Sequence, residues 1–357
     1  METRIADRVL WGVALLGGAA LLLFLWAVRD VLLLGFAGVL LAVLFRTPAE
    51  WLHSRLGIPV TAAVGLVVVL TLGALIGAFW LHGGKIGEQV TELRKQLPQA
   101  AAQIKSRLQQ TSWGQKLVEE VPAPEELLPD AQGAVERATG VLSGTLAVLT
   151  NGLVILFLGV VFALGPQPYL SGIVRLVPIA RRDRAREVLR QLGSTLRWWL
   201  FGRLISMTVI GLLTGIGLSL LGVPLAIALA LFAALLSFIP NVGPILALVP
   251  AVLLGFLDSP TRALHVGLLY IGVQIVETYV LAPFIDKKTI YLPPALTVLA
   301  QLAMAVFAGL LGVALATPIL AVTVVLVRLL YVEDVLGDQA STSSASSIPP
   351  LAPAAKR

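Results

Sequence analysis

The sequence predicts an all-α membrane protein with several spans, on the basis of its composition, the clustering of its charges and the length of its apolar runs. Hydrophobic residues make up 57% of the 357-residue chain and charged residues only 13%, against about 25% charged residues in a typical soluble domain. Residues 204–257 and 289–327 contain no Asp, Glu, Lys, Arg or His. Because a helix needs about 20 apolar residues to cross a bilayer, runs of this length indicate lipid as the main solvent.

The apolar runs predict about seven to eight membrane segments, two of them interrupted. The first run follows Arg4 and Arg8 as in a signal peptide, but no small-residue cleavage site and polar start come after it, so we expect it to remain as a span. In chain order the runs occupy residues 9–28, 31–45, 60–81, 141–164, 204–221, 225–257, 263–285 and 295–330.

The run at residues 225–257 contains the sequence Ile-Pro-Asn-Val-Gly-Pro at positions 239–244. Each half is too short to cross a bilayer alone, and two prolines and a glycine do not fit within one regular helix. We therefore predict a re-entrant helical hairpin whose tip lies inside the membrane. The run at 295–330 is interrupted by Gly309 and Gly312. It forms either a second hairpin or a full crossing, which would place the C-terminus outside.

Two long polar segments separate the spans. Residues 85–140 are nearly charge-balanced, and the apolar side chains in their first part recur at helical spacing, which predicts a small helical extramembrane domain bent at Pro98. Residues 165–203 carry eight arginines and an apolar stripe, which predicts a helix lying in the plane of the membrane interface. The residues expected to contact lipid there are Arg186, Arg190, Arg197, Trp198 and Trp199.

The arginines also predict the orientation of the chain. Because short segments rich in Lys and Arg stay cytoplasmic, residues 165–203 and the N-terminus should lie inside a bacterial inner membrane, with residues 85–140 outside. A final tail rich in Ser, Ala and Pro should be disordered. The predicted units are N-terminal spans at 1–84, an external helical domain at 85–140, a span with the interfacial helix at 141–203, a transport core at 204–332 and the tail at 333–357.

Glu277 is the most informative single residue, because it lies in the apolar run 263–285 and no nearby Lys or Arg in the sequence compensates its charge. Placing a charge at the centre of a span costs roughly 2.5–3.5 kcal/mol on insertion scales. Tyr270 and Gln274 share a helical face with Glu277. This group predicts a site that exchanges a proton or a cation. A hydrogen bond between helices, without a role in transport, is the alternative interpretation.

The two interruptions predict the binding site for a transported solute or ion. Proline removes a backbone donor and leaves carbonyl groups unpaired, and in lipid such groups must find partners or line a cavity. Many transporters build their sites from broken helices in this way. Small residues also allow close helix packing without any role in transport, which is the alternative for the second interruption. The candidate binding residues are Pro240, Asn241, Gly243, Pro244, Gln301, Gly309, Gly312 and Thr317.

These motifs, in this order, resemble the autoinducer-2 exporter family of bacterial membrane proteins. The sequence Ile-Pro-Asn-Val-Gly-Pro is similar to the family's Ile-Pro-Tyr-Ile-Gly-Pro, with Asn241 in place of the usual aromatic residue. Residues 162–166 lack the acidic residue often found after the fourth span. The layout matches over residues 9–332. The remaining positions that carry the resemblance are Gln274, Glu277, Pro283, Gly309, Gly312, Ala316 and Pro318.

The resemblance implies an exporter of small signalling molecules or metabolites, driven by a proton or cation gradient and assembled as a homo-oligomer. Exchange of sodium or lithium for protons is the alternative within transport, and a non-transporting membrane scaffold is the alternative outside it. The sequence has no cysteine, no Walker lysine loop, no His-Glu-x-x-His and no Gly-x-Ser-x-Gly, so we expect no enzyme, cofactor or metal. The net charge of +6 follows from the arginine-rich loops and predicts contacts with lipid rather than nucleic acid.

Overall fold

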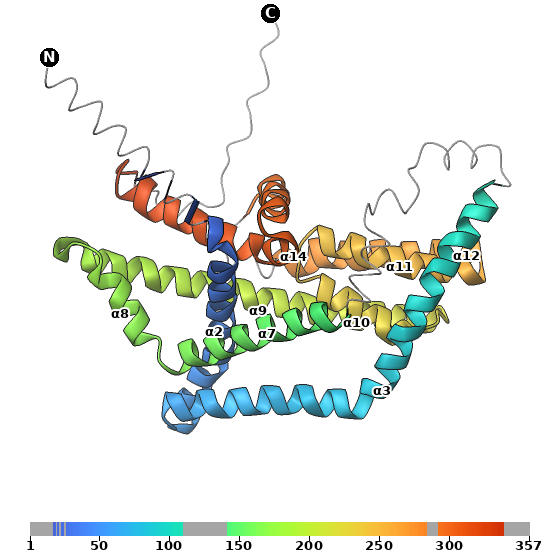
Figure 1. Ribbon diagram of the computed structural model, residues 1–357, viewed down its shortest axis with the longest axis horizontal. Coiled ribbons are helices and arrows are strands. Elements are labelled where there is room, and N and C mark those ends of the chain that lie inside the picture. The colour runs from blue at the N-terminus through green and yellow to red at the C-terminus, as the bar shows by residue number, and fades with distance from the viewer. Residues whose placement is uncertain are drawn as a thin grey trace, which may run out of the picture.

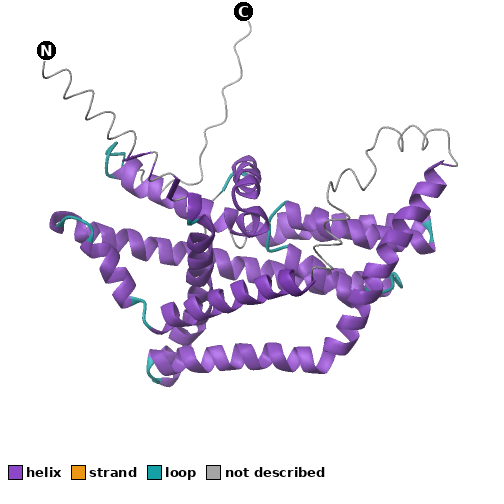
Figure 2. Cartoon of the chain, viewed as in Figure 1, coloured by secondary structure: helices purple, strands orange, loops and turns teal. Residues whose placement is uncertain are grey.

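The computed structural model describes residues 17–18, 20, 23–24, 26–109, 141–283 and 292–338, and all regular elements within them are helical (Figures 1 and 2). This confirms the predicted all-α class. The predicted first span, 9–28, lies largely outside the described residues. The elements are α2 (Arg29–Leu56), α3 (Val60–Gln109), α7 (Val141–Leu164), α8 (Gln167–Arg175), η1 (Ile179–Arg181), α9 (Arg182–Leu220), α10 (Ala226–Leu236), α11 (Val242–Asp258), α12 (Pro260–Ile275), η2 (Val276–Leu281), α14 (Pro294–Leu326) and η3 (Val327–Glu333).

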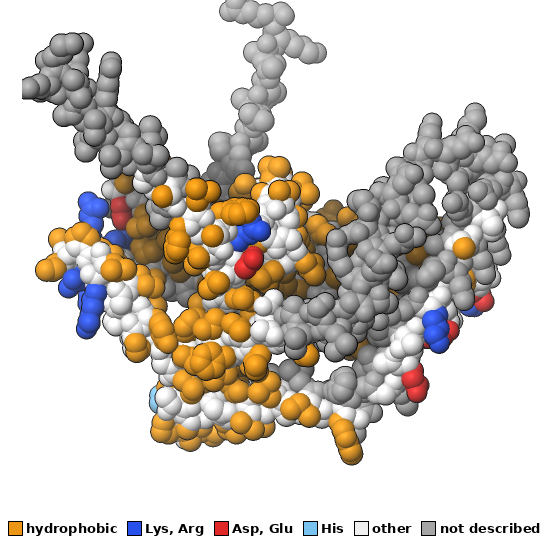
Figure 3. Space-filling model, viewed as in Figure 1, with side chains coloured by type: hydrophobic (Ala, Val, Ile, Leu, Met, Phe, Trp, Pro, Cys, Tyr) orange, Lys and Arg blue, Asp and Glu red, His pale blue; other side chains and the backbone are white. Residues whose placement is uncertain are grey.

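Several helices of this fold are long enough to cross a membrane. Within the described residues, four stretches are long and apolar enough to cross a bilayer, and α7 with α8 makes a fifth candidate that is bent by 82°. The hydrophobic surface seen in Figure 3 fits a lipid environment, while Lys and Arg gather at the end where α8 and the start of α9 lie. The four stretches are Arg29–Leu56, Ile179–Leu220, Pro260–Leu281 and Pro294–Glu333.

Helix α2 is longer than the sequence predicted. The apolar runs predicted a short span at 31–45 that ends well before the next span begins at residue 60, but one helix of 28 residues runs on to Leu56. The polar residues find partners without leaving the helix, because Arg46 Nε bonds Glu50 Oε1 at 2.8 Å and Arg46 Nη1 bonds the Ala163 carbonyl at 3.1 Å. The helix ends at Gly57, whose φ of 69° forms a left-handed cap.

Helix α3 joins two units that the sequence analysis separated. The predicted boundary at residue 84 falls inside a continuous helix, and Pro98 does not end it. Figure 1 shows α3 changing direction sharply along its length. Its straight apolar part, Val60–Ala74, is shorter than the span predicted at 60–81. The rest of the predicted external domain, residues 110–140, lies outside the described residues.

Helix α9 packs against helices from both the N-terminal and the C-terminal parts of the chain. The prediction of a separate interfacial helix that ends by residue 203 was wrong, because a single helix of 39 residues continues through this point. Its buried face runs along the whole length: Val188 packs against the end of α14 and η3. Leu196 packs against α2 and α14, whereas Ile210 and Leu218 pack against α10, α11 and α12. One continuous apolar stripe therefore ties the N-terminal helices to the C-terminal ones.

Both predicted interruptions break the helices where expected. Helices α10 and α11 form a hairpin with its turn at residues 237–241, and Gly243 lies so close to the Leu236 carbonyl that a Cβ would overlap it. Helix α14 is bent at Ala308 and Gly309, where φ is −146° and 58°. The bend brings Gly312 against the Met304 carbonyl, although eight residues of straight helix would separate them by about 12 Å.

Candidate functional site

The carboxylate of Glu277 meets the guanidinium of Arg203 in the interior of the molecule. Nη1 of Arg203 lies 3.2 Å from Oε1 of Glu277, and the two side chains are only 11% and 12% exposed. Glu277 comes from η2 and Arg203 from the middle of α9. A residue 74 positions away therefore supplies the compensating charge that the local sequence lacks, and sequence analysis did not identify Arg203 as part of the site.

Arg203 also holds the turn between α10 and α11. Its Nε donates to the Phe238 carbonyl at 3.1 Å, just beyond the C-terminal end of α10, where the helix dipole is negative and favours a cation. Trp199, one helical turn before Arg203, packs edge-on against the Phe238 ring at 5.7 Å. Trp199 thus supports the turn, whereas the sequence predicted it as an interface anchor. One guanidinium connects the buried carboxylate with the broken helix.

Gln274, which the sequence placed on the same helical face as Glu277, bonds its carboxylate in the structure. Nε2 of Gln274 donates to Oε2 of Glu277 at 3.1 Å, so both carboxylate oxygens have a donor. Glu277 lies in the π-helical segment η2, a type of widened turn that occurs often at functional sites. Tyr270 lies on the same face but belongs to the apolar core, and its hydroxyl has no partner within the described residues.

The hairpin turn has a strained backbone at Asn241. Its φ and ψ are 64° and −48°, and the Val242 N–H bonds the Pro240 carbonyl at 2.7 Å, which makes a γ-turn. Asn tolerates positive φ better than most residues, while its side chain is exposed. Pro244 lies in the first turn of α11, where its missing N–H is not needed. The backbone conformation of the turn therefore explains why Asn241 and Pro244 occur at these positions.

Gln301 links the second interruption to the first. The side chain is 2% exposed, and its Nε2 donates to the Pro240 carbonyl at 2.8 Å. Its Oε1 is buried without a hydrogen-bond partner in the described part of the chain. Thr317 is also buried, with an unpartnered Oγ1. Among the candidate residues of α14, Gln301 is the one that a hydrogen bond brings to the hairpin turn.

The predicted lipid-contacting arginines have partners within the protein. Arg186 pairs with Asp183 at 2.5 Å and Arg190 with Glu187 at 2.8 Å, both on the exposed surface of α9. Arg197 instead reaches α2, where its Nη2 lies 2.9 Å from Glu50. Trp198 is 40% exposed.

A second set of ion pairs holds the C-terminal segment. Nη2 of Arg184 bonds the Leu329 carbonyl at 3.1 Å and lies within 3.0 Å of carboxylates of Glu333 and Asp334. The first residues of the tail predicted to be disordered, Glu333 and Asp334, are therefore held by ion pairs, and residues 339–357 lie outside the described residues.

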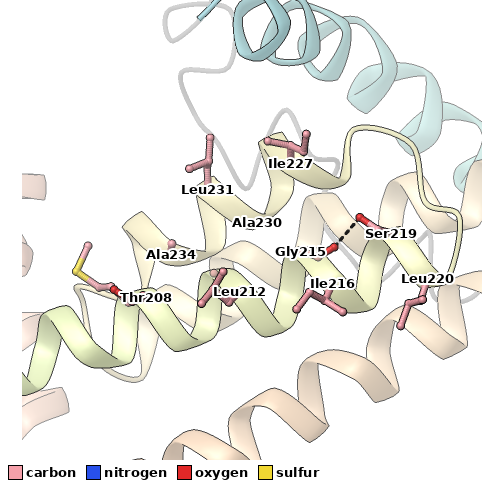
Figure 4. A pocket seen from close by; sticks show the side chains of 12 residues that line it. Thr208, Leu212, Gly215, Ile216, Ser219, Leu220, Ile227, Ala230, Leu231 and Ala234 are labelled. Atoms are coloured by element: carbon pink, nitrogen blue, oxygen red, sulfur yellow. Dashed lines mark hydrogen bonds between the residues drawn. The ribbon is translucent and has the colours of Figure 1, made fainter. Parts of the chain in front are cut away.

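A surface groove between α9 and α10 is separate from these polar groups. It has a volume of about 610 Å³ and is lined by apolar and small residues with no charge (Figure 4). Gly211 and Gly215 allow the close approach of the two helices, because a Cβ at either would press on Ala234 or Ala230. No three His, Asp or Glu side chains of the described residues converge as a metal centre would require. The buried pair, not this groove, carries the ionisable chemistry.

Several apolar helices with polar groups gathered at a broken helix are a pattern that many membrane transport proteins share. The chain belongs to the AI-2E transporter family, whose pattern matches residues 15–331. It is 30% identical to YueF of Bacillus subtilis, a relative named as a transport protein, over 74% of this chain and 75% of that one. Identity is 26% to MT0215 of Mycobacterium tuberculosis, with 91% of both chains covered, and 25% to YrrI of B. subtilis, with 80% and 82% covered; both are also named as transport proteins.

Proposed function

We propose that the chain is a secondary transporter that exports small signalling molecules or metabolites, with Glu277 coupling the movement to a proton or cation gradient. The observation that carries this proposal is the connection of three elements at one turn. Arg203 joins Glu277 to the Phe238 carbonyl, and Gln301 joins the bent helix α14 to the Pro240 carbonyl of the same turn. A movement of the turn therefore acts on the guanidinium that pairs with the buried carboxylate.

We further propose that the arginine-rich end of α9 faces the cytoplasm of a bacterial inner membrane, as the positive-inside rule requires. Under this orientation, the contacts of Arg184 with Glu333 and Asp334 support a cytoplasmic position for the end of η3 as well. Lys287 and Lys288, which precede α14 in the sequence, predict a cytoplasmic start for this helix too. A cytoplasmic position for both ends favours a re-entrant α14 over a single crossing. The homo-oligomer implied by the family resemblance stays a prediction, which cross-linking in native membranes can test.

Two other functions remain as alternatives. A sodium or lithium antiporter would need the cation to bind Glu277, but Arg203 already occupies one of its oxygens. Sodium-driven proton movement in everted vesicles that is lost in Glu277→Gln would favour this alternative. A non-transporting scaffold would fail completely on deletion of residues 85–140, whereas a transporter should retain some flux.

The test of the proposed function compares two glutamines that bond the same hairpin at opposite ends. Gln301→Leu removes the bond to the Pro240 carbonyl at the turn, and Gln89→Leu removes the 3.0 Å bond to the Ala228 N–H at the start of α10. In proteoliposomes containing autoinducer-2 or labelled metabolites, under a proton or sodium gradient, Gln301→Leu should lower flux about tenfold, equivalent to roughly 1.4 kcal/mol. Gln89→Leu should transport nearly as wild type. Equal flux in both variants, or no gradient-dependent flux of any solute in wild type, would end the proposal.

A further inference from the structure

Arg203 has a buried donor that nothing in the described part of the chain uses. Its Nε bonds Phe238 and its Nη1 bonds Glu277, but Nη2 is buried without a hydrogen-bond partner. A guanidinium carries five N–H donors and does not lose its charge in proteins. An unsatisfied donor on a buried cation is costly. The position next to Nη2 therefore suits an acceptor that arrives from outside, and an anionic oxygen is the strongest acceptor for a guanidinium.

Charge balance limits what can bind there. The pair of Arg203 and Glu277 is neutral. Within the described residues, Arg203 is the charged side chain that contacts Glu277. No charged residue occurs in α9 after Arg203, in α10, in α11 before Asp258 or in α14. The other titratable side chain on the helical face of Glu277 is Tyr270. A cation that displaced Arg203 would leave an excess positive charge. An anion bound beside an ionised Glu277 would leave an excess negative charge, and either excess is unfavourable in a membrane interior.

For an anionic ligand, one exchange keeps the site neutral: the anion binds Arg203 while Glu277 becomes protonated. The hydrogen bonds of the site permit this exchange. Oε1 of Glu277, which faces Arg203, can carry the proton, while Oε2 continues to accept from Nε2 of Gln274. The carboxyl group is then neutral and still anchored, and the guanidinium is free to turn toward the new anion. Its bond to the Phe238 carbonyl connects this change to the hairpin turn.

We propose that Arg203 binds the carboxylate of a small organic monoanion and that Glu277 takes up one proton in the same step. This inference rests on the proposed transport function and names its substrate class. The loaded site carries Arg203, the substrate carboxylate and a neutral Glu277, and the empty site carries the Arg203–Glu277 pair. Both states are uncharged overall, so the anion and the proton cross together in the same direction. Export is then driven by the outward gradient of the anion and moves a proton out against the proton gradient, and neither the anion alone nor a metal cation is carried.

The experiment measures ligand binding by thermal unfolding of the full-length protein in detergent, at several pH values from mildly acidic to mildly basic. Acetate and benzoate are the probes, with acetamide and benzamide as neutral controls. The two carboxylates should raise the unfolding temperature and the amides should not. The apparent affinity for each carboxylate should weaken about tenfold per pH unit at basic pH, because one proton is taken up with the anion.

Four variants separate binding from folding. Arg203→Gln should abolish carboxylate binding, and Glu277→Gln should retain it without pH dependence. The neutral double variant should unfold cooperatively and bind neither probe. Arg184→Gln is the matched control, since Arg184 also bonds a backbone carbonyl and a carboxylate but lies at the end of α9, and it should bind as wild type.

Three results would overturn the inference: equal shifts with amides and carboxylates, binding that survives in Arg203→Gln, or wild-type pH dependence in Glu277→Gln. Absence of any shift in wild type would also overturn it, and would leave the ion pair as a purely structural contact. Because no flux is measured, these results are independent of the Gln301→Leu comparison. A flux defect in Gln301→Leu together with no carboxylate binding would retain the transporter and reject the anionic substrate.

Discussion

At the scale of single residues, Glu277 and Arg203 can be buried because each neutralises the other. Glu277 receives donors on both oxygens, and Arg203 donates to a carboxylate and a carbonyl. Such pairs contribute little net stability compared with apolar residues, but removal of one partner leaves an isolated charge in a medium that cannot solvate it. The pair is therefore sensitive to single changes and tolerant of a double one.

Arg203→Gln should lower the free energy of unfolding by about 3–5 kcal/mol, the range observed when a buried pair loses one partner. The double change Arg203→Gln with Glu277→Gln should recover most of this loss, because no buried charge remains. Reversible unfolding by denaturant in detergent gives the free energy of unfolding of both single variants, Arg203→Gln and Glu277→Gln, and of the double variant. Together with wild type these values form a double-mutant cycle. Losses that simply add in the double variant would show that the two side chains do not act as a pair.

Gly243 is a second residue whose role is defined by its immediate contacts. A methyl group there would overlap the carbonyl of Leu236, so Gly243→Ala should force the hairpin apart and destabilise the protein by about 1–3 kcal/mol. Gly272→Ala in α12 is the matched control, because nothing lies within 4 Å of its Cβ position. Thermal unfolding in detergent should show a loss for the first variant only. A wild-type unfolding temperature for Gly243→Ala would mean that the turn adapts.

At the scale of elements, α9 decides how the remaining helices are arranged. Its N-terminal half packs on α2, α14 and η3, and its C-terminal half packs on α10, α11 and α12. Arg203 lies between these halves, so a shift of the hairpin relative to α9 would act directly on the ion pair. The same helix holds the last described segment through Arg184, which bonds Leu329, Glu333 and Asp334.

Arg184→Gln should release η3 from the start of α9, because the guanidinium provides all three of these contacts. Hydrogen exchange of residues 327–338 should become faster, while exchange in α11 and α12 stays unchanged. The effect on global stability should be small, about 0.2–1 kcal/mol per partly exposed pair. Arg186→Gln, which removes a local pair with Asp183 on the same helix, is the control. Unchanged exchange in η3 would show that apolar contacts alone hold it.

At the scale of the whole molecule, charge and polarity separate toward the two ends of the helical bundle. Ion pairs of Arg184 and Arg197 join the N-terminal half of α9 to η3 and α2. At the other end of the bundle, Gln89 of α3 contacts the start of α10, which follows the end of α9. The hydrophobic surface between these ends suits lipid (Figure 3). This arrangement predicts which residues face each side of the membrane.

Cysteine labelling tests that orientation directly, because the native chain has no cysteine. An impermeant maleimide added to spheroplasts should label Glu92→Cys, which lies in the exposed later part of α3, and should not label Arg186→Cys. Everted vesicles should give the reverse pattern. Labelling of Arg186→Cys from outside would invert the proposed topology, whereas the internal contacts of the ion pair would stand.

The sequence alone predicted the membrane class, the helical fold and both helix interruptions, because long apolar runs and helix-breaking residues act locally. It also predicted that Gln274 and Glu277 share one helical face, and in the structure a hydrogen bond joins them. It did not predict the continuity of α2 and α9, whose polar residues find partners on other helices. Nor could it assign Arg203 to the site, because that contact depends on the packing of α9 against α12 and the turn after α10.

The pattern of hydrophobic and helix-breaking residues thus determined where helices form, where they break and which carboxylate is buried, since each of these follows from a few neighbouring residues and from lipid as solvent. The tertiary structure decided that this carboxylate is neutralised by Arg203 and connected to the hairpin turn. The physical reason is that a charge within hydrocarbon must find its counter-charge in space, and the residue that supplies it can lie anywhere along the chain.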